Sequence, residues 1–241
     1  MGRGAGAYKQ NHRLTLTFTG SHATARAGTL QAKAGGNPLK RQLMTEKQQE
    51  RIKGKIRRIK SALAADKKRW GGFYDDSRGL RYLPPALYLQ LGDFSGGLRY
   101  LNWFNRHFPD DSGFPDFLFE WAVILFKTGR QKEAERKAFR AFCRNTYLFD
   151  KFFGRPIVPV PKWEGSNLES PGFAVHHFDY SSKQADLADF SAWLDRLTQS
   201  AEFRRLSEKY IAIQRRLKNE SDTETRRYLC RLAAQLEDEM Q

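Results

Sequence analysis

His176-His177-Phe178-Asp179 is the one run of residues in the chain with the side chains of a metal site. Neighbouring histidine side chains diverge along the backbone, and no third ligand lies close to the run in sequence. The sequence also has no glycine-rich phosphate loop, no Gly-x-Ser-x-Gly elbow and no His-Glu-x-x-His pair. We therefore expect no metal, no cofactor and no catalytic residue, and we predict that the protein is not an enzyme.

Cysteine is the other reactive side chain to consider. Cys143 lies among Lys137, Arg140 and Arg144, and such cations can lower the pKa of a thiol. No base is identifiable near it, so a structural thiol is the better interpretation. The second cysteine, Cys230, is distant, and the lack of a Cys-x-x-Cys pair excludes zinc-knuckle and thioredoxin-type sites. Two distant thiols fit a reducing compartment, so we expect a cytoplasmic protein; a single disulfide is the alternative.

Basic residues are concentrated at the N-terminus. The net charge is +15, yet residues 1–43 hold seven Lys and Arg with no acid, and residues 44–69 hold ten against three acids. The remaining residues are close to neutral. A polyanion, if one binds, must therefore bind the N-terminal part of the chain.

Residues 44–70 are predicted to form a basic amphipathic helix. Ile52, Ile56, Ile59 and Leu63 recur at helical spacing, and Gly71-Gly72 supplies a stop. Six cations are available on the rest of the helix: Arg51, Lys53, Lys55, Arg57, Arg58 and Lys60. They are either the solvated face of a docked helix or a surface that binds RNA, the ribosome or acidic lipid.

Residues 1–43 are rich in Gly, Ala, Thr and basic residues and poor in bulky apolar ones. Such a segment cannot bury enough surface to offset its ordering entropy, so we predict a disordered extension. A transit peptide is one alternative, and the one we favour is that Met44 is the true start. No apolar run is long enough to span a bilayer, so we expect no membrane insertion.

Aromatic residues mark the expected core. Sixteen of the 18 Phe lie between Phe73 and Phe190, and all five Trp lie between Trp70 and Trp193. Aromatic side chains bury large areas, so this region should contain helices packed through bulky side chains.

Two segments within residues 71–154 share a spacing. Leu91-Gly92-Asp93-Phe94 is followed by Gly97, Phe104 and Pro109. The turn Lys127-Thr128-Gly129 lies 37 residues later, and its small residues follow at the same spacing: Ala134, Ala138 and Ala141. This pattern resembles the tetratricopeptide repeat superfamily, in which a small residue five after the turn glycine lets two helices approach closely.

The resemblance implies an all-α fold with two degenerate antiparallel helical hairpins. Two departures from the family pattern concern Pro84-Pro85, which shortens the first helix, and Thr146, which stands where proline is usual. An unrelated helical bundle with coincidental spacing is the alternative.

The resemblance further implies a concave groove lined by the first helix of each hairpin. Its lining residues would be Tyr82, Leu89, Phe119, Val123, Phe126 and Lys127. We therefore predict a non-catalytic module or adaptor that binds another protein or peptide. Either the groove takes an apolar anchor of that partner, or later segments of the chain fill it, which is the arrangement we favour.

The C-terminal part should cover these hairpins. Residues 155–182 contain four prolines together with several apolar residues, so we predict an irregular loop that lies across the helices. Residues 183–241 are predicted to form three helices, with apolar stripes at Leu187–Leu197, Phe203–Leu217 and Leu229–Met240. We expect Ser181-x-x-Gln184 and Ser221-x-x-Glu224 to cap the first and the last of them.

Overall fold

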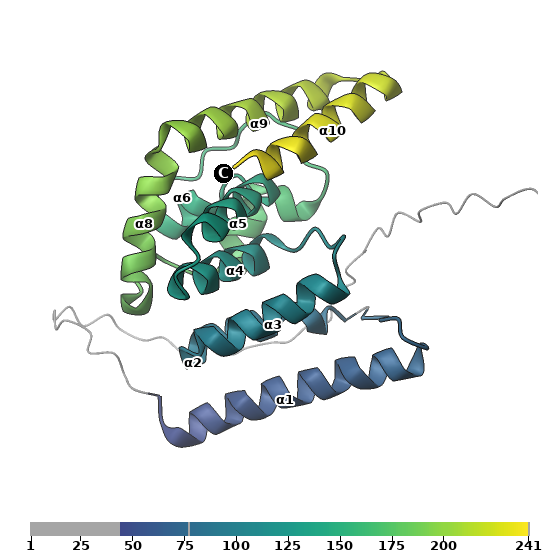
Figure 1. Cartoon of the computed structure of the whole chain (residues 1–241). Coiled ribbons are helices and arrows are strands. Elements are labelled where there is room, and N and C mark those ends of the chain that lie inside the picture. Colours follow the sequence, from purple (N-terminus) through teal and green to yellow (C-terminus); the bar gives the residue numbers. More distant parts are fainter. Residues whose placement is uncertain (1–43, 77, 241) are drawn as a thin grey trace, which may run out of the picture. The chain divides into compact units, whose positions relative to one another are not determined.

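Helices are the only regular secondary structure in the computed structural model, which describes residues 44–76 and 78–240 (Figure 1). The predicted all-α class is therefore confirmed for these residues. The helices are α1 (Glu46–Arg69), α2 (Pro84–Leu91), α3 (Phe94–His107), α4 (Pro115–Lys127), α5 (Gln131–Arg144), α6 (Leu148–Phe153), α7 (Pro171–His177), α8 (Ala188–Gln199), α9 (Ala201–Asn219) and α10 (Thr223–Glu239). Short 3-10 turns occupy Leu80–Tyr82, Asn167–Glu169 and Ala185–Leu187. The expectations for residues 1–43 lie outside the described residues.

Helix α1 begins at a capping box. The backbone N–H of Gln48 donates to the Thr45 hydroxyl over 3.3 Å, and the Thr45 N–H donates to the Gln48 side chain over 2.9 Å. The buried stripe Ile56, Ile59 and Leu63 packs against α2 and α3 in a small cluster with Leu87, Tyr88 and Tyr100. One side of α1 is thus fixed to the rest of the molecule.

Helices α2 to α5 follow one another with short turns. The α2–α3 and α4–α5 turns each contain a glycine with positive φ, 68° at Gly92 and 76° at Gly129. The most extensive contact between two helices joins α4 and α5. The small residues that the spacing singled out are all buried: Gly97, Ala134, Ala138 and Ala141. A Cβ on Gly97 would come within 2.8 Å of Ile124 Cδ1, so these helices approach as closely as glycine allows.

The segment after α5 is more helical than predicted. Helix α6 was not expected, and α7 lies inside residues 155–182, where we predicted an irregular loop. The missed signal is Ser170-Pro171: the Ser170 hydroxyl accepts from the Phe173 N–H over 3.3 Å, and Pro171 occupies the first helical position. The loop does pack onto the helices, since the Trp163 N–H donates to the Gln214 carbonyl over 2.9 Å.

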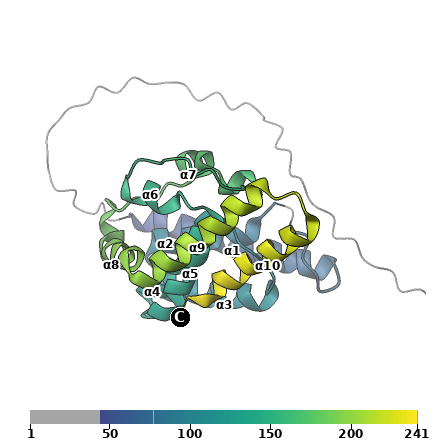
Figure 2. The ribbon, with the colours of Figure 1, turned by 90° about the horizontal axis from the view of Figure 1, so that it is seen from above.

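Helices α8, α9 and α10 complete the fold, with α9 and α10 side by side and both in contact with α5 (Figures 1 and 2). Two predicted caps are wrong. Helix α8 begins only at Ala188, after a 3-10 turn, and the N-cap of α10 is Asp222, whose carboxylate accepts from the Thr225 N–H over 2.8 Å. No helix among the described residues is both long enough and apolar enough to cross a bilayer.

Candidate functional site

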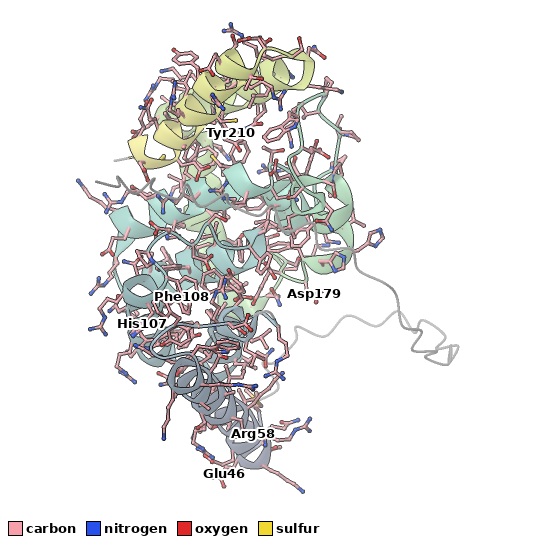
Figure 3. The ribbon with its side chains drawn as sticks, turned by 90° about the vertical axis from the view of Figure 1, so that its right-hand side faces the viewer. Glu46, Arg58, His107, Phe108, Asp179 and Tyr210 are labelled. Carbon is pink, nitrogen blue, oxygen red and sulfur yellow. The ribbon has the colours of Figure 1, made fainter. Side chains whose placement is uncertain are left out.

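The outer face of α1 is open. All six cations predicted as a polyanion surface are exposed, whereas Ile56, Ile59 and Leu63 of the apolar stripe between their rows are at most 6% exposed. They form two rows at helical spacing: Arg51, Lys55 and Arg58 in one, and Lys53, Arg57 and Lys60 in the other. Arg58 extends from the ribbon of α1 into solvent (Figure 3). From Arg51 to Lys60 the helix rises about 14 Å at 1.5 Å per residue, so each row forms a short basic ridge along one flank of the apolar stripe.

Few acids neutralise this surface. Glu50 lies 3.0 Å from the Lys53 amine and 4.0 Å from the Arg57 guanidinium, and its hydrogen bond with Lys53 lowers the pKa of its carboxyl. No Asp or Glu occurs from Arg51 to Ala65. Among the described residues, the other four cations of the two rows have no carboxylate within ion-pair distance.

The row facing α2 lines a shallow cleft of about 510 Å³. Arg51, Lys55 and Arg58 form one wall, and Leu87 and Gln90 of α2 lie opposite. Guanidinium and ammonium groups donate several hydrogen bonds each and match phosphate oxygens in charge. The chemistry of this cleft and of the face beside it is therefore that of an anion-binding surface.

Two aromatic residues at the C-terminal end of α1 lie outside the core. Trp70 is 48% exposed and Phe73 is 79% exposed, so the expectation that the aromatic run from Trp70 onward forms the core is wrong at its first two members. Composition could not reveal this, because Trp70 and Phe73 flank the turn at Gly71-Gly72 and no other helix of the described residues covers them.

The predicted groove residues are brought together, but inside the core. Phe119 is 1% exposed and Val123 is fully buried. The Phe119 ring centroid lies within 5.4 Å of four other aromatic rings, those of Phe152, Phe178, Tyr180 and Phe190. The assignment of Phe119 and Val123 to a partner-binding surface is therefore corrected: α6, α8 and the segment before α8 cover them.

The other four groove candidates also contact their own chain. The Tyr82 hydroxyl donates to Asp111 over 2.6 Å, and Leu89 is 8% exposed. The Phe126 ring lies 5.0 Å from the Trp193 ring, and the Lys127 amine donates to the Asp186 carbonyl over 2.8 Å and pairs with Asp189. Helix α8 thus occupies the space that a partner was expected to take.

Part of the groove remains as an acidic cavity of about 310 Å³ between α2, α4 and residues 177–187. Glu120 is 5% exposed and accepts a hydrogen bond from the Tyr180 hydroxyl over 2.8 Å. Burial raises the pKa of the Glu120 carboxyl well above its usual range, with a further contribution from Asp116, and burial also raises the pKa of Asp116. Among the described residues, neither carboxylate has a cation within ion-pair distance.

A second cleft, of about 260 Å³, lies between α3, α5 and α10. The Lys137 amine there sits 3.7 Å from the centroid of the Trp121 ring. Burial, followed by the nearby Arg140, lowers the pKa of Lys137 to about 8. The sequence identified Lys137 only as a neighbour of Cys143, because its enclosure depends on α3, α4 and α10 packing around α5.

The histidines and the cysteine considered for chemistry lie in opposite environments. His176 and His177 are exposed, and the described residues contain no group of three His, Cys, Asp or Glu side chains arranged to hold a metal. Cys143 is buried and free, and its burial raises the pKa of the thiol well above its usual range. A thiol in that environment is a poor nucleophile.

Scans against models of known protein families, and searches of curated proteins and of solved structures, find no match to this chain. The function must therefore be inferred from the geometry of the open face of α1 and of the filled groove.

Proposed function

We propose that this protein is a non-catalytic helical binding protein that takes RNA on the exposed basic face of α1. The observation that carries the proposal is the exposure of all six cations, four of them without a carboxylate partner among the described residues. Phosphate groups would supply the missing counter-charge and release their own counterions on binding.

A membrane surface fits this helix less well than RNA does. An interfacial helix has to bury its apolar face in the boundary between headgroups and acyl chains. The apolar stripe of α1 is already used, because Ile56, Ile59 and Leu63 pack against α2 and α3. Only the charged side is left for a partner.

Helices α2 to α5 are, in this proposal, two degenerate tetratricopeptide hairpins that carry α1. The buried small residues Gly97 and Ala134 and the positive φ of Gly92 and Gly129 support the assignment. The free thiols of Cys143 and Cys230 support a reducing, cytoplasmic location.

Two charge variants of the full chain test the proposal. In the α1 variant, the six cations Arg51, Lys53, Lys55, Arg57, Arg58 and Lys60 become Gln. In the α9 variant, six exposed cations of another helix become Gln: Arg204, Arg205, Lys209, Arg215, Arg216 and Lys218. Gln has a helix propensity close to that of Lys and Arg, and both variants lose the same charge.

Fluorescence anisotropy with a labelled, unstructured RNA between about 50 and 200 mM salt gives the readout. For the α1 variant we expect affinity to fall at least tenfold and the salt slope to drop by up to about 4, which is six phosphate contacts at about 0.7 each. The α9 variant should stay within about threefold of wild type. Equal losses in the two variants would show that net charge, not the α1 face, attracts the RNA, and would overturn the proposal.

The acidic cavity supports a second candidate, an adaptor that binds another protein. Asp116 and Glu120 are desolvated carboxylates without a cationic partner among the described residues, so a Lys or Arg side chain of a peptide would satisfy them. Under this candidate, Asp116→Asn abolishes capture of a protein partner and leaves RNA affinity unchanged.

A further inference from the structure

Trp70 and Phe73 lie at the C-terminal end of α1, after Lys67, Lys68 and Arg69, and they are 48% and 79% exposed. Phe73 is the most exposed of the large apolar side chains in the described part of the chain. A free Phe or Trp exposes apolar area to water at a cost, so a pair of them beside a charged surface indicates a contact site.

The backbone holds both side chains outward. The Trp70 N–H donates to the Asp66 carbonyl over 3.0 Å, and the Gly72 N–H donates to the Lys67 carbonyl over 2.8 Å. The Asp75 N–H donates to the Asp66 carboxylate over 2.7 Å and ties the chain back to the helix. The turn needs Gly72, whose φ of 107° is one that other residues rarely adopt. The aromatics are thus presented by a hydrogen-bonded turn.

Cations lie beside Trp70, the first of the two aromatic residues. The Arg69 guanidinium lies 5.8 Å from the Trp70 ring, and Lys68 is exposed next to it. A ring beside a guanidinium is the arrangement that proteins use for unpaired bases, in which the ring stacks on the base and the cation contacts its phosphate.

We propose that Trp70 and Phe73 stack on unpaired bases, so that the RNA bound by α1 is single-stranded where it passes the end of the helix. This inference rests on the proposed function and defines its substrate class. The bases of a duplex are stacked on each other and cannot reach the rings, so the aromatics should contribute to single-stranded binding alone.

The test uses the full chain, a labelled unstructured RNA and an RNA duplex of the same length. The double variant Trp70→Ala/Phe73→Ala should lose at least tenfold in affinity for the single strand and stay within twofold of wild type on the duplex. Tyr228→Ala, which removes a 54% exposed aromatic from α10, is the matched control and should bind both RNAs like wild type.

Conservative variants separate stacking from simple apolar contact. Phe73→Tyr keeps a planar ring and should keep the affinity for the single strand. Phe73→Leu has no ring, so its affinity should fall nearly as far as that of Phe73→Ala. Trp70→Phe should also keep the affinity, but it should reduce the RNA-dependent quenching of tryptophan fluorescence. Full retention of that quenching would mean that Trp70 does not contact the bases, and would overturn the inference.

The two proposals fail in different ways. If the double variant binds the single strand within twofold of wild type while the α1 variant does not bind, the base-stacking inference is wrong and the RNA proposal stands. If the α1 variant binds like wild type, the RNA proposal is wrong. A third outcome would overturn both proposals. In it, the wild type binds vesicles of anionic phospholipid but not RNA, and Trp70→Ala/Phe73→Ala no longer binds the vesicles.

Discussion

The outer face of α1 and the groove between α2 and α4 are both built from one side of a helix, but their environments are opposite. On α1, Ile56, Ile59 and Leu63 are buried, and the two rows of cations that flank this stripe remain exposed. On α4, Phe119 and Val123 face the groove and are nevertheless buried, because α6, α8 and the segment before α8 cover them.

Charged and apolar residues therefore differ in how well they predict an accessible surface. A run of cations without acids resists burial by its own chain, since desolvating an unpaired charge is costly. An apolar row attracts any free apolar segment, and this chain carries several after α5. Charged positions on α1 therefore stay available to a partner, while an apolar groove can be filled before a partner arrives.

Removing a ring from the filled groove should give the largest effect. We expect Phe119→Ala to lower the free energy of unfolding by about 3–5 kcal/mol, because the truncation leaves a cavity among four aromatic rings. Phe73→Ala removes the same atoms from an exposed position and should change the free energy of unfolding by less than about 0.5 kcal/mol. Urea unfolding followed by circular dichroism measures both. Similar values for the two variants would mean that the groove is open in solution.

A smaller effect is expected where α5 meets α4. Ala134 is fully buried, and Ala134→Leu should cost about 1–3 kcal/mol through overpacking. Ala64→Leu adds the same atoms to an exposed position of α1 and should be nearly neutral. The same unfolding series checks both. If Ala134→Leu unfolds with the same free energy as wild type, this residue lies away from the helix contact. The main support for the tetratricopeptide hairpin would then also be lost.

The third expected effect depends on pH and concerns the acidic cavity. Because burial raises the pKa of Glu120, the folded state holds its proton above the ordinary value of 4.5, where the unfolded state has released it. Stability should therefore fall as pH rises from about 5 toward neutrality, up to the raised pKa. The Gln side chain of Glu120→Gln cannot ionise and keeps an acceptor for Tyr180. The stability of this variant relative to wild type should therefore increase with pH.

Unfolding curves at a series of pH values measure that difference. Tyr180→Phe provides a second variant, because loss of its hydrogen bond removes an influence that lowers the pKa of Glu120. The loss of stability should then extend to higher pH. A pH-independent difference between Glu120→Gln and wild type would show that the carboxyl is not desolvated as described.

Local patterns in the sequence were enough for the all-α class and for the charged side of α1. The spacing of Ile52, Ile56, Ile59 and Leu63 is a property of one helix, and the cations between them follow from the same period. These features depend on neighbours within a few residues, which the sequence displays directly.

Contacts between distant segments decided the rest. Phe119 is covered by Phe178 and Phe190, which lie far along the chain, and Lys137 is enclosed because α3, α4 and α10 pack around α5. Trp70 and Phe73 are aromatic like the core residues, yet within residues 44–76 and 78–240 they are left 48% and 79% exposed. Burial of an apolar side chain depends on which other segment reaches it, and that is a property of the tertiary structure.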